Sequence, residues 1–256
     1  MDNILTTHIN PKILEKQNLD QVASSFKGQT LMQSNKGLET LHSKVTRTKF
    51  DLIQSISKKS RQFIQLKEIL IPKQRAILMQ ELEKISWEKI NDPHKESLST
   101  SQIQKNSHSE FLESKDFQDF IEKITSTKID ENISWQFQKF QKNDFTLLHD
   151  DNLNEEKNSE TLLIIFDLTR KWPIEARGEI VITTANNTNQ KNNNSTPLII
   201  RPIENTLSII KLKKDDMYFT KFINSSAQNK ELIRIIGIAN IQWLFSQKPF
   251  LVNFTD

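Results

Sequence analysis

The sequence predicts an α+β fold in which α-helices precede an all-β sandwich or jelly roll. Two observations carry this prediction. Eight short runs rich in Ile, Phe, Thr and Leu, separated by turn residues, follow one another from about residue 135 to residue 241. Before residue 135, two segments have apolar residues at helical spacing. Runs of helices followed by runs of strands are typical of an α+β chain.

The composition of the chain limits its partners and its compartment. It has 256 residues, with 35 basic and 32 acidic residues and a net charge of +3, so we expect no nucleic-acid partner. It contains no cysteine, which excludes disulfides and thiolate metal sites. No stretch approaches the roughly 20 apolar residues of a membrane span, and no secretory signal is apparent. We therefore expect a cytoplasmic protein with no membrane partner.

The first 60 residues differ from the rest of the chain. They are polar and weakly periodic, so we expect residues 1–60 to form an N-terminal extension that is helical or partly disordered. Residues 61–256 are expected to form the main domain. It begins with a strand in residues 61–71, and a helix then starts at Pro72. Ile77, Leu78 and Leu82 recur at helical spacing in this helix and predict one buried face.

A second helix is predicted after a polar segment. Residues 91–109 are polar, and we expect a loop there. Ser114 is a good N-cap residue for the helix that follows. Phe117, Phe120, Ile121 and Ile124 form its apolar stripe.

The strands of the predicted sandwich are short and well separated. A polar tract, ANNTNQKNNNST, lies between two of them and is expected to be a solvated hairpin loop. The eight runs are WQFQKF, FTLLHDD, TLLIIFDL, GEIVITT, TPLIIRPI, NTLSIIKL, MYFTKFI and LIRIIGIANI.

One of these runs ends in a candidate metal site. In a strand, residues i and i+2 point to the same side, so His149 and Asp151 can direct an imidazole and a carboxylate to one point. This pair is two thirds of the 2-His-1-carboxylate facial triad that holds non-haem Fe(II). On the tripeptide alone, a strand end whose polar residues face solvent is the better explanation.

The order of several motifs resembles a known family, the 2-oxoglutarate/Fe(II)-dependent oxygenases of the prolyl 4-hydroxylase type. The chain is most similar to those that act on ribosomal-protein proline. FQKNDFTLLHDD resembles the family pattern Tyr-x-x-Gly-Asp-(Phe/aliphatic)-x-x-x-His-x-Asp. TLLIIFDLTRKWPIEARGEIVI resembles the strand, the Asn/Asp-x-x-Trp turn and the Gly-Gly-Glu-Leu strand that follow. RPIENTLSII and LIRIIGI resemble the Pro-x-x-Asn-Ser-Leu and Arg-x-x-Ile-x-Gly-Trp strands.

The resemblance implies a fold, two cofactors and a reaction. The fold would be a double-stranded β-helix, a form of jelly roll, preceded and backed by α-helices. His149 and Asp151 would be ligands of Fe(II), and 2-oxoglutarate would be the co-substrate. The reaction would be oxidative decarboxylation of 2-oxoglutarate with hydroxylation of a substrate C–H bond. The substrate would be a side chain of a protein or peptide.

The chain departs from the family pattern at the third metal ligand. The family has a distal histidine before the last strand, but no histidine follows His149. Thr220 stands at the position that we align with it, and a neutral hydroxyl is a weak ligand for Fe(II).

The chain also departs at the co-substrate positions. Phe140 replaces a tyrosine that contacts the co-substrate, and Asn143 replaces a glycine whose left-handed backbone it can still adopt. Leu232 replaces the basic residue that pairs with the distal carboxylate of 2-oxoglutarate. Arg234 lies two residues further on the same face, and its guanidinium suits a carboxylate, so we predict 2-oxoglutarate contacts at Arg234 and Phe140. A surface arginine on an edge strand is the alternative.

Three functions remain open from the sequence. The first is a hydroxylase that uses Fe(II) and 2-oxoglutarate. The second is a catalytically inactive protein of the same fold, acting as a binding or scaffolding module. The third is a small-molecule or sugar-binding jelly roll unrelated to oxygenases.

Overall fold

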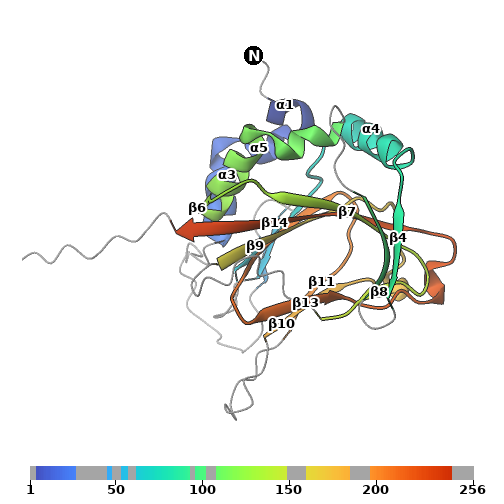
Figure 1. Ribbon diagram of the computed structural model, residues 1–256. Helices are drawn as coiled ribbons and strands as arrows, with labels where there is room; N and C mark the ends of the chain where they lie inside the picture. The colour runs from blue at the N-terminus through green and yellow to red at the C-terminus, as the bar shows by residue number, and fades with distance from the viewer. Residues whose placement is uncertain are drawn as a thin grey trace, which may run out of the picture.

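The computed structural model describes residues 4–26, 45–47, 53–56, 62–92, 96–101, 108–148, 160–184 and 197–243. Two antiparallel β-sheets face each other, and helices cover the outer face of the larger sheet (Figure 1). The helices and 3₁₀ turns of the described residues are α1 (Ile4–His8), α2 (Pro11–Leu14), α3 (Lys16–Phe26), α4 (Pro72–Leu82), η1 (His108–Glu113), α5 (Lys115–Thr125), η2 (Ile174–Ala176) and η3 (Ser225–Ala227).

The larger sheet has the strand order β1-β2-β3-β12-β9-β14-β7-β5-β4, and its neighbouring strands are antiparallel. Outside this path, β6 pairs with β14 and β8 pairs with β5. The strands of this sheet are β1 (Val45–Arg47), β2 (Ile53–Ile56), β3 (Phe63–Lys67), β4 (Glu88–Asp92), β5 (Glu96–Ser101), β6 (Thr127–Ile129), β7 (Ser134–Phe140), β8 (Phe145–Thr146), β9 (Glu160–Asp167), β12 (Thr206–Leu212) and β14 (Leu232–Trp243).

The smaller sheet lies opposite the inner face of the larger one. Its order is β11 (Leu198–Ile200), β10 (Ile180–Thr184) and β13 (Asp216–Thr220). β8 lies beside β13, because the Thr220 backbone N–H donates to Thr146 Oγ1 at 2.7 Å. β8 also pairs with β5 of the larger sheet, so it joins the two sheets into a barrel. All eight predicted strand runs contain a strand, which confirms the β part of the predicted fold.

β9 shows why the central strands read as continuous apolar runs. Its even-numbered residues, Leu162 to Phe166, belong to the core between the sheet and the helices. Leu163 and Ile165 belong to the core between the two sheets. Because both faces of β9 are buried, seven of its eight residues are inaccessible, and polar alternation is lost.

The helices bury their apolar faces against the outer side of the large sheet. Ser114 is the N-cap of α5 as predicted, and its Oγ accepts from the Phe117 backbone N–H at 3.2 Å. The predicted stripe of α5 is buried. Pro72 is the first residue of α4, whose Leu78 and Leu82 are buried. Both helix predictions are therefore confirmed.

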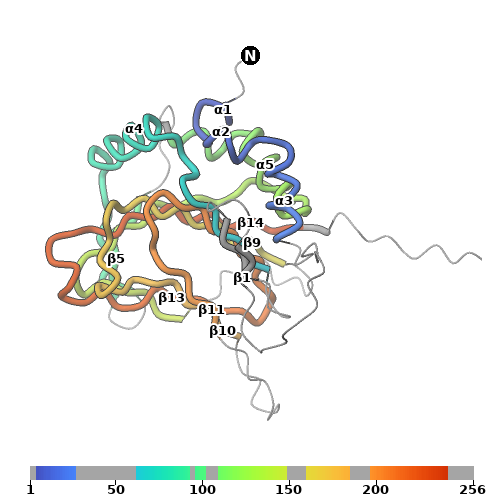
Figure 2. Tube along the Cα trace, turned by 180° about the vertical axis from the view of Figure 1, so that it is seen from behind, coloured from blue at the N-terminus to red at the C-terminus, as the bar shows by residue number. Residues whose placement is uncertain are grey.

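The N-terminal helices pack on the same core. Ile9, Ile13, Val22 and Phe26 are each at most 3% exposed and lie with α5 in the outer core (Figure 2). The Asn10 backbone N–H donates to the carbonyl of Ile69 at 2.8 Å, which ties this segment to the chain after β3. Residues 4–26 thus cover part of the sheet, while the boundary at residues 60 and 61 stays a prediction.

Where the structure describes residues 91–109, the prediction of a loop was wrong. β4 and β5 form a hairpin in this segment, and η1 begins at His108. β4 is the edge strand of the large sheet, and most of its residues are exposed. In β5 the buried residues include Ser97, Ser99 and Thr100. Polar residues on both strands remove the hydrophobic alternation by which strands are recognised.

Candidate functional site

Three of the five predicted site residues fall within the described part of the chain. Phe140 ends β7, Thr220 ends β13 and Arg234 lies near the start of β14. His149 and Asp151 lie outside the described residues. The site is therefore built here from the barrel interior around Phe140, Thr220 and Arg234.

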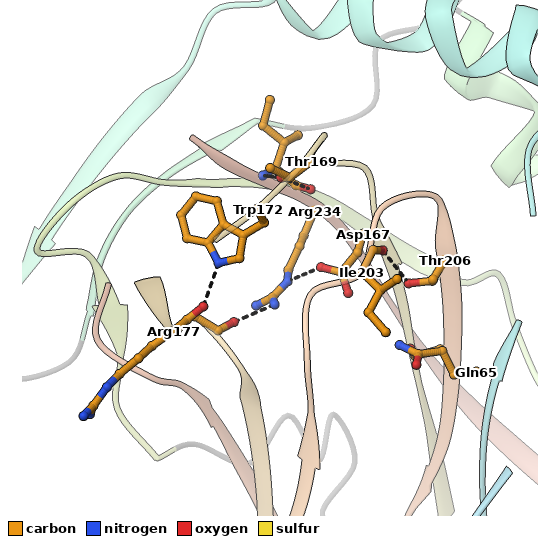
Figure 3. Close-up of polar contacts among 11 residues, drawn as sticks. Gln65, Asp167, Thr169, Trp172, Arg177, Ile203, Thr206 and Arg234 are labelled. Carbon is orange, nitrogen blue, oxygen red and sulfur yellow. Dashed lines mark hydrogen bonds and ion pairs between the residues drawn. The ribbon is translucent and has the colours of Figure 1, made fainter. Parts of the chain in front are cut away.

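Arg234 is fully buried in the barrel and is paired with an acid. Its relative exposure is 0%, and that of Asp167, directly opposite on β9, is 1%. Arg234 Nε donates to Asp167 Oδ1 at 2.6 Å, and Nη2 donates to the carbonyl of Gly178 at 2.6 Å (Figure 3). Two of the guanidinium nitrogens are thus held by the protein itself through charge-assisted bonds, and the bond to Asp167 is also an ion pair. The surface-arginine alternative is wrong.

This pair belongs to a polar row that crosses the inner face of the large sheet. Neighbouring members lie directly opposite each other in the strand register, so their side chains share a face. All but Gln138 are buried, and Gln138 is half-buried. The row consists of Thr100, Gln138, Arg234, Asp167 and Thr206. It separates the apolar core between the sheets from a second apolar cluster at one end of the barrel.

Burial changes the pKa of Asp167, the acidic partner of Arg234. Removal from water raises the pKa of the Asp167 carboxyl above its ordinary value, and the charge of Arg234 opposes this shift. Asp167 Oδ2 and Arg234 Nη1 have no hydrogen-bond partner among the described residues. Each charge therefore depends on the other for stabilisation, because little else in the barrel compensates for its lost hydration.

The second apolar cluster, called the end cluster below, fills the barrel beyond the polar row. Leu232 and Phe140 lie opposite each other in β14 and β7, and both are 0% exposed. Trp172 is half-buried against the cluster. The members of the end cluster are Leu98, Phe140, Ala176, Ile223, Ala227, Leu232 and Trp172. Phe140 thus has the contacts of a core residue.

The turn after β9 is closed tightly over the end cluster. Trp172 Nε1 donates to the carbonyl of Arg177 at 2.7 Å (Figure 3). Gly178 follows with φ +81°, a backbone conformation that side chains disfavour. A Cβ at Gly178 would lie 2.6 Å from Ile223 Cδ1 and 2.7 Å from Leu232 Cδ2. Glycine is therefore required here so that the backbone can approach the cluster and offer its carbonyl to Arg234.

Thr220 is buried at the junction of the two sheets. It is 4% exposed and lies opposite Ile180 in the register of β13 and β10. Its backbone N–H bonds the hydroxyl of Thr146, which lies three residues before His149. Among the described residues, no group of three His, Cys, Asp or Glu side chains could hold a metal ion.

The turn before β8 is fixed by a buried aspartate. Asp144 is 3% exposed, and its Oδ1 accepts from Lys89 Nζ at 2.6 Å and from Ser97 Oγ at 2.7 Å. Its Oδ2 accepts from the Gln141 backbone N–H at 2.7 Å. Asn143 precedes it with φ +74°, the left-handed backbone expected at the family's glycine position. The Asn-Asp pair therefore shapes the turn and links β4, β5 and β7.

Replacing Asp144 by Ala should lower the free energy of unfolding by about 3 kcal/mol, because three donors lose a charged acceptor and the bond from Ser97 is buried. Urea unfolding followed by circular dichroism would measure this. Asp119→Ala is a matched control, since the Asp119–Lys115 pair is exposed on α5. That control should leave the transition unchanged. Equal effects of the two substitutions would contradict the role assigned to Asp144.

The described residues fit 2-oxoglutarate poorly. Arg234 Nη1 is without a partner, which favours a ligand. Against this, the aligned anchor position holds Leu232, and Phe140 has no hydroxyl to offer. The charge of Arg234 is already neutralised by Asp167, so a dianion would enter a buried site with no net positive charge. The described residues therefore offer 2-oxoglutarate no site that matches its charge.

The sequence reasoning missed Asp167. It stands at the end of the apolar run TLLIIFDL, where an acid is normally the polar end of a strand. A signal was present, because an acid and a base both interrupt the inward-facing positions of neighbouring apolar strands. Their pairing could be recognised only once the register of β9 and β14 was known.

Comparison with known families and structures places the chain among oxygenases. A family model described as oxoglutarate and iron-dependent oxygenase degradation C-term matches residues 1–238. No curated protein matches the chain.

Solved structures of similar fold include a prolyl 4-hydroxylase from Pseudomonas putida. It has 11% identity and a TM-score of 0.54, with 72% of this chain and 95% of that chain covered. A Trichoplax adhaerens prolyl hydroxylase has 11% identity and a TM-score of 0.52, with coverage of 70% and 83%. A 2OG-Fe(II) oxygenase family member from Burkholderia pseudomallei has 12% identity and a TM-score of 0.52, with coverage of 70% and 85%. The predicted jelly roll of the oxygenase type is confirmed.

Proposed function

The chain belongs to the family described as oxoglutarate and iron-dependent oxygenase degradation C-term, and from this premise we propose that it is a non-catalytic oxygenase-fold protein that acts as a binding module. The predicted resemblance to 2-oxoglutarate/Fe(II) oxygenases of the prolyl 4-hydroxylase type is confirmed by the family and by its structural neighbours. The third possibility, a jelly roll unrelated to oxygenases, was wrong.

One observation carries the proposal. The only arginine of the barrel interior near the predicted co-substrate position is neutralised by Asp167 at 2.6 Å and bound to the Gly178 carbonyl, in the part of the chain that the structure describes. The end cluster supports the same conclusion, because Leu232 and Phe140 fill the neighbouring space with apolar side chains. An apolar interior with a neutralised arginine stabilises the fold, but its described residues have no free positive charge to bind a dicarboxylate.

The proposed binding role is supported by a structure of similar fold that has a bound peptide. The Trichoplax prolyl hydroxylase is in complex with a hypoxia inducible factor oxygen degradation domain peptide fragment. A protein or peptide is therefore the class of partner that we propose. None of the described helices is long and apolar enough to cross a membrane. A cytoplasmic location remains part of the proposal, from composition.

The competing function is turnover by His149, Asp151 and Thr220 as iron ligands, with Arg234 and Phe140 at the co-substrate. An anaerobic titration of the full chain with Fe(II) and 2-oxoglutarate separates the two. We expect no visible charge-transfer band of an iron chelate, no succinate after oxygen is admitted, and no ligand-induced rise in Tm.

A prolyl 4-hydroxylase assayed in parallel is the positive control for that titration. A band together with succinate, both lost in His149→Ala, would show that the chain is an enzyme and would overturn the proposal.

A further inference from the structure

Three loops close the end of the barrel that holds the end cluster. They are residues 139–144, 168–179 and 221–231, and we call their outer surface the loop face. The Ile223 backbone N–H donates to the carbonyl of Asp144 at 2.9 Å, and Asn224 Nδ2 donates to the carbonyl of Glu175 at 2.6 Å. The 221–231 loop, orange-red, projects from one end of the barrel in both views (Figures 1 and 2). The loop face is therefore one continuous surface.

The residues of the loop face have a net positive charge. Its seven basic residues exceed its four acidic residues by three, which equals the net charge of +3 of the whole chain. The rest of the chain is thus electrically balanced. The basic residues are Lys139, Lys142, Arg170, Lys171, Arg177, Lys221 and Lys230, and the acidic ones are Asp144, Glu175, Glu179 and Glu231.

Most of the acidic residues of the loop face are already paired. Asp144 binds Lys89 of β4, Glu231 lies 3.5 Å from Lys139, and Glu179 lies 3.9 Å from Lys221. Within the described residues, Glu175 has no ionic partner. Five exposed basic side chains also lack an acidic partner there: Lys142, Arg170, Lys171, Arg177 and Lys230. The exposed charge of the face is therefore strongly positive.

Two large apolar side chains are exposed among these charges. Ile174 of η2 is 70% exposed, and Phe222, just after β13, is 47% exposed. η2 and the segment after β13 are in contact, because the Asn224 backbone N–H donates to the carbonyl of Ala176 at 3.2 Å. Exposed apolar residues set among unpaired cations are typical of a surface that a partner covers.

We propose that the loop face docks an acidic segment of another protein. Carboxylates of the segment would pair with Arg170, Arg177 and their neighbours, and its apolar side chains would cover Ile174 and Phe222. The proposal rests on the proposed function as a binding module and names the surface and the partner. A nucleic acid fits less well, because its phosphates would be repelled by the carboxylate of Glu175 and would make no apolar contact with Ile174.

Fluorescence anisotropy of the full chain tests the proposal. The probe is a fluorescein-labelled synthetic peptide in which Glu and Asp alternate with Leu and Phe. We expect binding that weakens steeply as NaCl is raised, because surface charges are screened. Arg170→Glu combined with Arg177→Glu should raise Kd by about tenfold or more. Ile174→Ser combined with Phe222→Ser should raise Kd by about fivefold, with the salt dependence kept.

Two controls make the result specific. Lys16→Glu combined with Lys128→Glu reverses the same amount of charge on α3 and β6, away from the loop face, and should leave Kd unchanged. A peptide with Lys in place of Glu and Asp should not bind. Absence of wild-type binding at low salt, an equal loss in both charge-reversal variants, or displacement of the probe by single-stranded RNA would each overturn the proposal. Succinate formation in the separate turnover assay would overturn the non-catalytic function and leave the docking result standing.

Discussion

Replacing Arg234 by Met is expected to lower the free energy of unfolding by about 3–5 kcal/mol, because it leaves the charge of Asp167 buried and uncompensated. Both side chains are at most 1% exposed and are joined at 2.6 Å. The guanidinium also donates to the Gly178 carbonyl, so the substitution removes a hydrogen bond that holds the turn over the end cluster. Equilibrium unfolding in urea, followed by tryptophan fluorescence, would measure the loss.

The loss should depend on pH in a defined direction. Burial already raises the pKa of Asp167 in the wild type, and removal of Arg234 removes the charge that opposes this shift. When folding raises the pKa of a carboxyl, the protein loses stability as the pH rises from the pKa of the unfolded state to the pKa of the folded state. The Arg234→Met variant should therefore be more destabilised at about pH 8 than at about pH 5.

A second substitution tests whether the charge is the cause. Combining Arg234→Met with Asp167→Leu should restore most of the lost stability, because a buried ion pair can be replaced by apolar residues of similar volume. Arg177→Met, in the exposed part of the loop face, is the matched control and should have little effect. An unchanged loss in the double variant would show that packing or the Gly178 bond, and not the unpaired charge, dominates.

Replacing Phe117 by Ala should also cost about 3–5 kcal/mol, because a large buried ring is lost and a cavity remains. Phe117 is 0% exposed at the centre of an aromatic group on the outer face of the large sheet. Its ring centroid lies 5.6 Å from Phe111, 5.8 Å from Phe166 and 6.0 Å from Trp135. Thermal unfolding followed by near-ultraviolet circular dichroism would report both the stability and the packing of the rings.

Phe222→Ala is the control for this prediction, since it removes the same side chain from an exposed position. It should shift the transition very little. If the Phe117 variant unfolded at the same temperature as the Phe222 variant, the helix layer would not be anchored by this group.

The outline of the fold could be predicted because its elements obey local rules. Ser114 caps α5, Pro72 begins α4, and β9 is apolar along its length because both of its faces are buried. β4 and β5 could not be predicted, because an edge strand and a strand with buried serines lack hydrophobic alternation.

The site was less predictable than the fold. The sequence places Arg234 on the inward face of its strand, which the structure bears out, but its partner lies 67 residues earlier in another strand. Only the register of β14 and β9 brings the two charges together. Asn143 is the opposite case, because its left-handed backbone follows from its own position in a short turn.

The row of polar side chains across the inner face of the sheet constrains how this sequence can diverge. Loss of either charge alone would leave the other charge buried and unpaired in an apolar interior. Substitution of Asp167 or Arg234 is therefore constrained. Related proteins should therefore carry acid and arginine at these two positions together, or replace both with apolar residues, and chains with only one of them should be rare. A chain that changed only one of the two positions would first pass through a form of reduced stability.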